Sequence, residues 1–403
     1  MAMHLPTRNH PNAPTRAITR RGLIGRLAAA GFTAPVIASV LRDSAWAQEA
    51  TPEAEPTAEE ILAGLGKDAR LIPQSTTNYE TPAALMDTFL TPNDQFFIRS
   101  NGPVSIDIPR AEWRLAVSGL VERELDLSFA DLEAMDQRTI TAFLACSGES
   151  RSRFGDDPEV VEGTKWGNRA IGNAEWTGVS LIDILNEAGV QPGAVDVVSQ
   201  GGDFPEMQRG LPIEIATDPD VMLVWQMNGE DLPAPNGGPV RLLVPGWGGI
   251  ASTKWIAGLD VIDRPFGGHY NTESYVIIDE DGAVVRPVRE MPVSSVITSP
   301  LPEAELAAGP VTLGGFAWSG YAGIERVEVS TDDGANWTEA EIVEEAGPLS
   351  WVRFEAPWQA AAGDAVLQSR AFDERGLGQP IDTAWNAKGY LQNSIYRVPV
   401  TVG

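Results

Sequence analysis

The only cysteine of the chain, Cys146, lies in a setting that could make it a metal ligand or a nucleophile. Arg151 and Arg153 follow it at five and seven residues, with mostly small polar residues between them. Nearby positive charge favours a thiolate, the form that binds metals and attacks electrophiles. A soft metal whose other ligands are non-protein sulfur needs only one protein thiolate. A thiol nucleophile would need a base, and His269 is the only histidine after residue 47. The third possibility is a small buried side chain at the end of a strand.

The cysteine and histidine counts exclude several kinds of site. The other two histidines, His4 and His10, lie near the N-terminus. One cysteine and one histidine cannot form a Cys/His zinc cluster, a cysteine-bound iron–sulfur cluster, a C-x-x-C-H haem attachment or a disulfide within the chain. We therefore expect no haem in this chain, so the electrons of any redox reaction would pass to an external acceptor.

Short motifs surround Cys146 and continue to the C-terminus. They are Phe96-Phe97-Ile98-Arg99, residues 143–153 around Cys146, Gly163-Thr164-Lys165-Trp166, residues 170–176, Asn228-Gly229, residues 238–246, Thr253-Lys254-Trp255 and residues 385–390. Taken together and in this order, they resemble the sulfite oxidase family of molybdopterin oxidoreductases over nearly the whole chain after the leader.

The resemblance implies a molybdenum–molybdopterin cofactor whose metal is bound by Cys146. It also implies a catalytic set around the metal. Arg99 and Arg151 would surround a small substrate anion, Lys388 would add a cation from the C-terminal domain, and Tyr275 would lie beside the metal. Guanidinium groups suit this role because their planar forks match flat-faced oxyanions.

The same resemblance implies the residues that bind the pterin. Arg241 and Lys254 would bind its phosphate, and Asp203 would pair with its ring. The remaining contacts would come from the segment around Arg99 and from the position where the family has a pterin-contacting histidine. These residues are Phe97, Ile98, Asn101 and Asn236.

The chain departs from the family pattern at several positions. Ser100-Asn101 replaces a frequent Asn-His, and residues 148–151 replace a frequent Gly-Asn-Arg-Arg. Ala251 and Lys388 stand where the family has arginines, and Asn236 replaces the histidine. We expect these departures to affect substrate preference more than cofactor binding.

The elements that position these residues are predicted to form two domains. In residues 81–285, residues 113–118 alternate as a half-buried strand, Ser128 and Ser180 each open a capped short helix, and residues 239–245 form a buried strand before a glycine-rich turn. Strands and helices mix without βαβ regularity, which predicts an α+β domain that binds molybdopterin.

The second predicted domain, residues 286–403, is all-β. Short strands are expected at residues 311–318, 324–330, 337–342, 351–355 and 365–371. Their regular spacing predicts an immunoglobulin-like sandwich, and the resemblance implies that this domain forms a homodimer.

The N-terminal part has the composition of a leader and a linker. Residues 1–47 contain Arg20-Arg21, an apolar run and an A-x-A site, which predicts a twin-arginine-type signal peptide and export to the periplasm or another extracytoplasmic space. Residues 48–80 are predicted to be an acidic linker and N-terminal extension, in which residues 48–60 lack the apolar side chains needed for order. No other apolar run is long enough to predict stable membrane insertion.

Net charge constrains the partners. Residues 1–47 carry six arginines and one acid, a net charge of +5. The formal net charge of the whole chain is −27, so the remaining residues carry a net charge of −32. Such a surface disfavours nucleic acid and anionic lipid and suits a basic partner. The family resemblance implies oxidation of sulfite, or a similar small oxyanion, to sulfate. The expected absence of haem and the negative charge together favour transfer of the electrons to a c-type cytochrome or a haem-bearing subunit.

Three alternatives remain at this point. A sulfoxide or other oxo-transfer reductase would use the same cofactor, although such enzymes usually lack the second domain. A non-catalytic binding protein could keep the same fold. A thiol enzyme could use Cys146 with His269.

Overall fold

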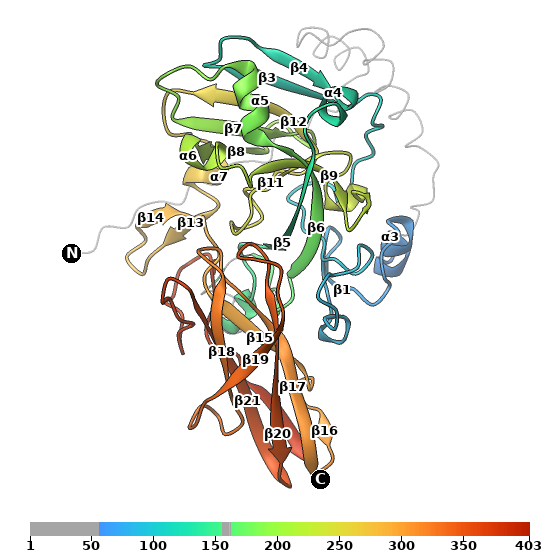
Figure 1. The fold of residues 1–403 in the computed structure, drawn as a ribbon, viewed down its shortest axis with the longest axis vertical. Helices are drawn as coiled ribbons and strands as arrows, with labels where there is room; N and C mark the ends of the chain where they lie inside the picture. Colours follow the sequence, from blue (N-terminus) through green and yellow to red (C-terminus); the bar gives the residue numbers. More distant parts are fainter. Residues whose placement is uncertain (1–55, 155–160, 162) are drawn as a thin grey trace, which may run out of the picture. The chain divides into compact units, whose positions relative to one another are not determined.

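The computed structural model describes residues 56–154, 161 and 163–403. The predicted signal peptide lies outside these residues, as do residues 48–55 of the predicted linker. Ala58–Gly403 forms one compact unit that includes both predicted domains (Figure 1).

The chain is ordered earlier than its composition predicts. Helix α3 (Ala58–Gly64) begins inside the acidic stretch that was expected to lack order. Its Leu62 is buried with Leu71, Tyr79 and Ile98, so the apolar residues that follow the stretch fix the helix. Strands β1 (Ile72–Ser75) and β2 (Asn78–Glu80) form a hairpin, and the 3-10 turn η1 (Ala83–Leu85) follows.

Two five-stranded sheets form the first domain. One has the order β10-β9-β6-β5, with β11 also paired to β9, and the other has the order β4-β3-β12-β7-β8. The strands of the first sheet are β5 (Arg138–Ala145), β6 (Ile171–Ser180), β9 (Met222–Met227), β10 (Glu230–Asp231) and β11 (Arg241–Leu243). Those of the second are β3 (Arg114–Gly119), β4 (Leu125–Ser128), β7 (Asp196–Gly201), β8 (Gln208–Pro212) and β12 (Ile256–Ile262). The mixed architecture confirms the predicted α+β class.

Short helices cover and connect these sheets. They are α4 (Phe129–Glu133), η2 (Arg151–Phe154), α5 (Leu181–Ala188), α6 (Ile213–Ala216), η3 (Ala234–Asn236) and α7 (His269–Thr272). The predicted cap at Ser128 is confirmed, because its side chain and that of Asp131 exchange hydrogen bonds with each other's backbone N–H. The predicted cap at Ser180 is wrong: its hydroxyl donates to the Pro219 carbonyl, 2.7 Å away, and leaves the start of α5 uncapped.

The second domain is the predicted β-sandwich. Its strands are β15 (Ser294–Ser299), β16 (Glu305–Leu306), β17 (Gly309–Trp318), β18 (Ile324–Ser330), β19 (Thr338–Glu344), β20 (Val352–Ala360), β21 (Gly363–Asp373) and β22 (Val398–Val402). All five predicted strands are present, and β15, β16 and β22 were not predicted. Buried residues such as Leu313, Phe354 and Leu367 fill the space between the layers.

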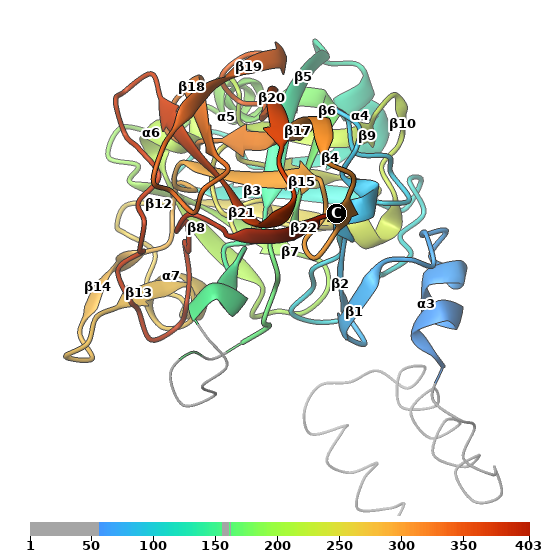
Figure 2. The same cartoon turned by 90° about the horizontal axis from the view of Figure 1, so that it is seen from below.

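A two-stranded ribbon joins the two domains. Strands β13 (Val276–Ile278) and β14 (Val284–Pro287) pair with each other and with no other strand of the described chain. In two perpendicular views the ribbon projects away from the sheets (Figures 1 and 2). No helix in the described residues is long and apolar enough to cross a membrane.

Candidate active site

Two adjoining cavities lie at the ends of β5, β11 and the ribbon. The first encloses about 680 Å³ and the second about 630 Å³, open mouths included. Four residues line both cavities: Arg99, Asn101, Cys146 and Tyr275. Cys146 therefore lies where the two spaces meet.

The local fold fixes Cys146 in place. It follows the last residue of β5, and its backbone N–H donates to the Ala170 carbonyl at 2.8 Å. The glycine-rich turn after β11 packs against the same strand end, since Gly249 donates to the Ala145 carbonyl at 2.7 Å. A Cβ on Gly249 would lie only 3.0 Å from that carbonyl oxygen, so the close approach favours glycine. The thiol sulfur accepts a hydrogen bond from the Gly148 N–H at 3.5 Å and is 6% exposed.

The second cavity is lined by cations without anionic partners. Arg99, Arg151 and Lys388 all line it, and none forms an ion pair within the described part of the chain. Arg151 is buried, and among the described residues it donates to the carbonyls of Thr164, at 2.9 Å, and Lys388, at 3.1 Å. Buried cations without counter-charges favour binding of an anion. All four residues of the predicted catalytic set line this cavity.

Aromatic rings form another wall of the second cavity. The hydroxyl of Tyr275 donates to Asn101 Oδ1 at 3.2 Å and lies 3.3 Å from the donating Nη2 of Arg99. The Tyr275 and Tyr390 rings stack at 5.1 Å, and the Arg151 guanidinium lies 4.8 Å from the Tyr390 ring centre. Burial, followed by the nearby Tyr275, raises the pKa of Tyr390. Tyr390 was recognised only as the end of a motif, which was the available signal for its place in the site.

The first cavity is lined by most of the predicted cofactor-binding set. Phe97, Asn101, Asp203, Asn236, Arg241 and Lys254 all reach it. Ile98 does not, which corrects the prediction for that residue. Its backbone pairs with that of Tyr79, and its side chain is buried against Leu62, Leu71 and Tyr79 instead of facing the cavity.

Uncompensated positive charge also marks the first cavity. Burial lowers the pKa of Arg241 to about 9, and its guanidinium donates to the carbonyls of Asn236 and Ser252, each at 2.7 Å. Burial, followed by the nearby Arg241, lowers the pKa of Lys254 well below its usual value. Both cations regain favourable interactions if an anionic group such as a phosphate enters.

Asp203 contributes an unused acceptor to the first cavity. Its Oδ1 is buried without a hydrogen-bond partner among the described residues, and burial raises the pKa of the carboxyl. A ligand that donates hydrogen bonds at this position would remove the cost of that unsatisfied oxygen.

A further cation behind this cavity was missed. The ammonium of Lys67 is buried and donates to Asn236 Oδ1 at 2.6 Å, and to the carbonyls of Asn93 at 2.6 Å and Phe96 at 3.2 Å. Burial lowers its pKa to about 7. Lys67 lies in the segment predicted to be a linker and extension, so no sequence signal identified it.

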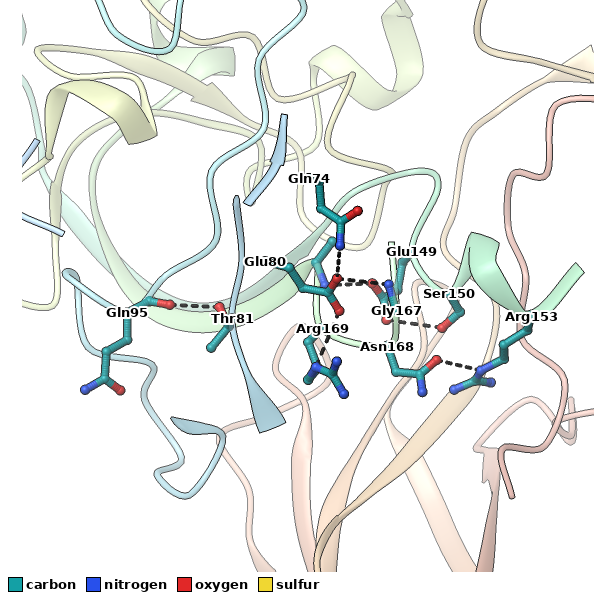
Figure 3. Close-up of polar contacts among 11 residues, drawn as sticks. Gln74, Glu80, Thr81, Gln95, Glu149, Ser150, Arg153, Gly167, Asn168 and Arg169 are labelled. Carbon is teal, nitrogen blue, oxygen red and sulfur yellow. Dashed lines mark hydrogen bonds and ion pairs between the residues drawn. The ribbon is translucent and has the colours of Figure 1, made fainter. Parts of the chain in front are cut away.

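A buried polar network holds the segment that follows Cys146 (Figure 3). Glu149 accepts from the Ala170 N–H at 2.8 Å, and Glu80 accepts from the Gly167 N–H at 3.0 Å. Burial, followed by the charge of Glu80, raises the pKa of Glu149 to about 8. Arg153 donates to Asn168 Oδ1 at 2.6 Å and lines neither cavity. The network joins the Cys146 segment to residues 167–170, and it accounts for a glutamate where the family often has asparagine.

The donor set fits a metal whose other ligands come from an organic cofactor. Within the described residues, no group of three or more His, Cys, Asp or Glu side chains could hold a metal ion. A metal at Cys146 therefore needs ligands from a bound molecule, and the adjoining cavity offers space, the buried cations Arg241 and Lys254, and the Asp203 oxygen that has no partner among the described residues. The thiol-enzyme alternative loses its base, because His269 lines neither cavity and its ring lies 3.3 Å from Glu273 on the surface.

Comparisons with known proteins agree with this geometry. A family model for an oxidoreductase molybdopterin binding domain matches residues 101–270, and one for a Mo-co oxidoreductase dimerisation domain matches residues 285–403. The sulfite oxidase of Arabidopsis thaliana is 31% identical over 81% of this chain and 92% of its own length. The mitochondrial sulfite oxidase of Drosophila melanogaster is 32% identical over 81% of this chain, which spans only 62% of that protein.

Two further comparisons bear on the reaction. The crystal structure of the sulfane dehydrogenase SoxCD from Paracoccus pantotrophus superposes with a TM-score of 0.75 and 33% identity, covering 87% of this chain and 93% of that one. An NADH nitrate reductase of Ulva prolifera is 29% identical over 82% of this chain and 42% of its own length. An alignment of that extent includes part of the sandwich, so a second domain does not by itself distinguish an oxidase from a reductase.

Proposed function

The chain belongs to the sulfite oxidase family of molybdopterin oxidoreductases, and from that membership we propose that it oxidises sulfite, or a similar small sulfur oxyanion, to sulfate. It is a molybdenum-dependent enzyme whose cofactor is molybdenum–molybdopterin. One observation carries the proposal: the only thiol lies where a cavity suited to the cofactor meets a second cavity lined by unpaired cations.

We assign the residues of the second cavity to the substrate. Arg99 and Arg151 bind the oxyanion and offset its charge, and Lys388 adds a third cation from the C-terminal domain. Tyr275, which lines both cavities, would donate a hydrogen bond to an oxygen of the bound substrate and would assist proton movement there. Arg99, Arg151 and Tyr275 are already held by hydrogen bonds to the backbone and to other side chains, so this part of the site is preorganised for negative charge.

We assign the residues of the first cavity to the cofactor. Cys146 would bind the metal, Arg241 and Lys254 would bind the pterin phosphate, and Asp203 would accept hydrogen bonds from the pterin ring. Phe97, Asn101 and Asn236 would complete the contacts. When bound, the cofactor supplies the two-electron chemistry at its metal, and the protein supplies placement and charge.

The electrons then leave to an external acceptor, for which we propose a basic c-type cytochrome or a haem-bearing subunit. We also propose export through the N-terminal leader by the twin-arginine route, and homodimer formation through residues 286–403. Folded export suits a protein that takes up its cofactor before it crosses the membrane.

The second candidate function is that of an oxo-transfer reductase. It is retained because the alignment with the nitrate reductase extends over 82% of this chain. Both candidates use the same cofactor and differ in the direction of the reaction. The departures at Asn101 and Lys388 lie in the cavity that would select between them.

Sulfite-dependent reduction of ferricyanide by purified holoenzyme tests the proposal. We expect turnover in the wild type, and none in Cys146→Ser or Cys146→Ala protein purified in parallel. A wild type that contains molybdenum but does not oxidise sulfite, while it reduces an S-oxide or N-oxide with a viologen donor, would identify the reductase instead.

A further inference from the structure

The β13–β14 ribbon, Val276–Pro287, exposes apolar surface close to the site. Val284 and Val285 are 54% and 59% exposed. The pairing of the ribbon is irregular at this point: Ile277 pairs with Arg286 and Ile278 pairs with Val284, which leaves Val285 as an extra residue of β14. An isolated two-stranded ribbon is marginally stable, and adjacent exposed apolar side chains on such an element indicate an interaction site.

Carboxylates surround this apolar pair. Asp279, Glu280 and Asp281 occupy the turn of the ribbon, against one arginine, Arg286. Asp279 stabilises the turn, since its Oδ1 accepts from the N–H groups of Asp281 at 3.1 Å and Ala283 at 2.8 Å. Glu280 and Asp281 are exposed and form no ion pair with any described residue. Their charge is therefore available to a partner.

The base of the ribbon is attached to the walls of the second cavity. Tyr275 directly precedes β13, and its carbonyl accepts from the Val288 N–H at 2.9 Å. The buried guanidinium of Arg209 donates to the carbonyls of Val288, at 2.5 Å, and Tyr270. On the other side, the Ala387 N–H donates to the Ile278 carbonyl at 3.1 Å, one residue before Lys388. The base of the ribbon is thus fixed to segments that line the second cavity, and Figure 2 shows the ribbon projecting from the rest of the fold.

We propose that the β13–β14 ribbon is the docking surface for a basic haem protein that accepts the electrons. The inference rests on the proposed function and adds the place of contact. Exposed carboxylates attract a basic partner and raise its association rate, and a small apolar centre with a charged rim suits a transient redox complex. Electron transfer slows steeply with distance, and the ribbon directly follows Tyr275, which lines both cavities.

Binding of a basic mitochondrial cytochrome c to the holoenzyme, measured by calorimetry at low and high salt, tests the proposal. The double variant Glu280→Gln/Asp281→Asn should weaken binding about tenfold at low salt and flatten its salt dependence. The double variant Val284→Thr/Val285→Thr, which keeps β-branched side chains, should weaken binding several-fold at both salts. The matched control, Glu339→Gln/Glu341→Gln on exposed β19 of the sandwich, should bind within twofold of the wild type.

Unchanged binding by both ribbon variants would overturn the proposal. A change in the subunit number of the ribbon variants, measured by light scattering, with cytochrome binding unaffected, would also overturn it, because the ribbon would then contact a second copy of this chain.

Ferricyanide reduction separates this test from the proposed function, because a small oxidant needs no docking surface. Ribbon variants should keep the wild-type ferricyanide rate, and an equal loss with both acceptors would place the defect in the metal site and contradict docking. Failure of the wild type to oxidise sulfite would refute the proposed function. The binding experiment would still test whether the ribbon is the docking surface.

Discussion

Replacing Arg151 tests the assignment of the second cavity to an oxyanion. Its guanidinium is buried and donates to two backbone carbonyls, those of Thr164 and Lys388, which leaves further N–H groups for a ligand. A hydrogen bond to a charged group contributes about 1.5–3 kcal/mol, and each 1.4 kcal/mol is about a factor of ten. We therefore expect Arg151→Met to lower kcat/KM for sulfite by roughly 10- to 150-fold. Arg151→Lys keeps the positive charge but loses the planar set of guanidinium donors, so its reduction in kcat/KM should lie near the lower end of that range.

Arg153 provides the matched control. It is also an arginine that follows Cys146 and is partly buried, but it lines neither cavity and bonds to Asn168 and to the Ser394 carbonyl. Arg153→Lys should lower the melting temperature and leave kcat/KM for sulfite unchanged once molybdenum content is equalised. The assay is steady-state ferricyanide reduction over a range of sulfite concentrations. Wild-type kcat/KM in an Arg151→Met protein with full molybdenum content would refute the reasoning.

Three further predictions follow from named contacts. Lys67→Met should lower molybdenum per protein several-fold, measured by elemental analysis, and Lys67→Arg should retain it, because the cation orients Asn236 at the cofactor cavity. In cofactor-free protein the folded-state pKa of Lys67 is about 7 against an ordinary value of 10.5, so the unfolded chain binds more protons between these values. Stability should therefore rise with pH across that window, and thermal scans of Lys67→Met should show a smaller rise. Tyr275→Phe removes the hydroxyl that bonds Asn101 and should lower kcat roughly 10²-fold with little change in molybdenum content, and an unaffected kcat would remove Tyr275 from the proton path.

Local sequence patterns were sufficient for much of the fold. The alternation in residues 113–118 and the five sandwich strands depend on neighbours a few residues apart, and all were found. The cap at Ser180 failed for a tertiary reason, since the Pro219 carbonyl competes for the hydroxyl. Helix α3 was missed because its order comes from packing against Tyr79 and Ile98, which an acidic composition does not reveal.

The candidate site likewise contains residues that the sequence identified and residues that it could not identify. Family motifs pointed to Cys146, Arg99 and Arg151, which all line the second cavity, although spacing alone could not show that the two cavities meet at Cys146. Lys67 could not be found, because its role depends on a contact with Asn236, 169 residues away. Ile98 was included with its neighbours because a motif records adjacency in sequence, which does not show that this side chain packs against Leu62, Leu71 and Tyr79.

The central claim is that the Cys146 sulfur binds molybdenum. X-ray absorption at the molybdenum edge counts the sulfur atoms bound to the metal in wild-type holoenzyme and in Cys146→Ser protein that has been loaded with cofactor. We predict one sulfur fewer in the variant, with the cofactor's own sulfurs unchanged. An identical number of sulfur ligands in the two proteins would contradict the claim.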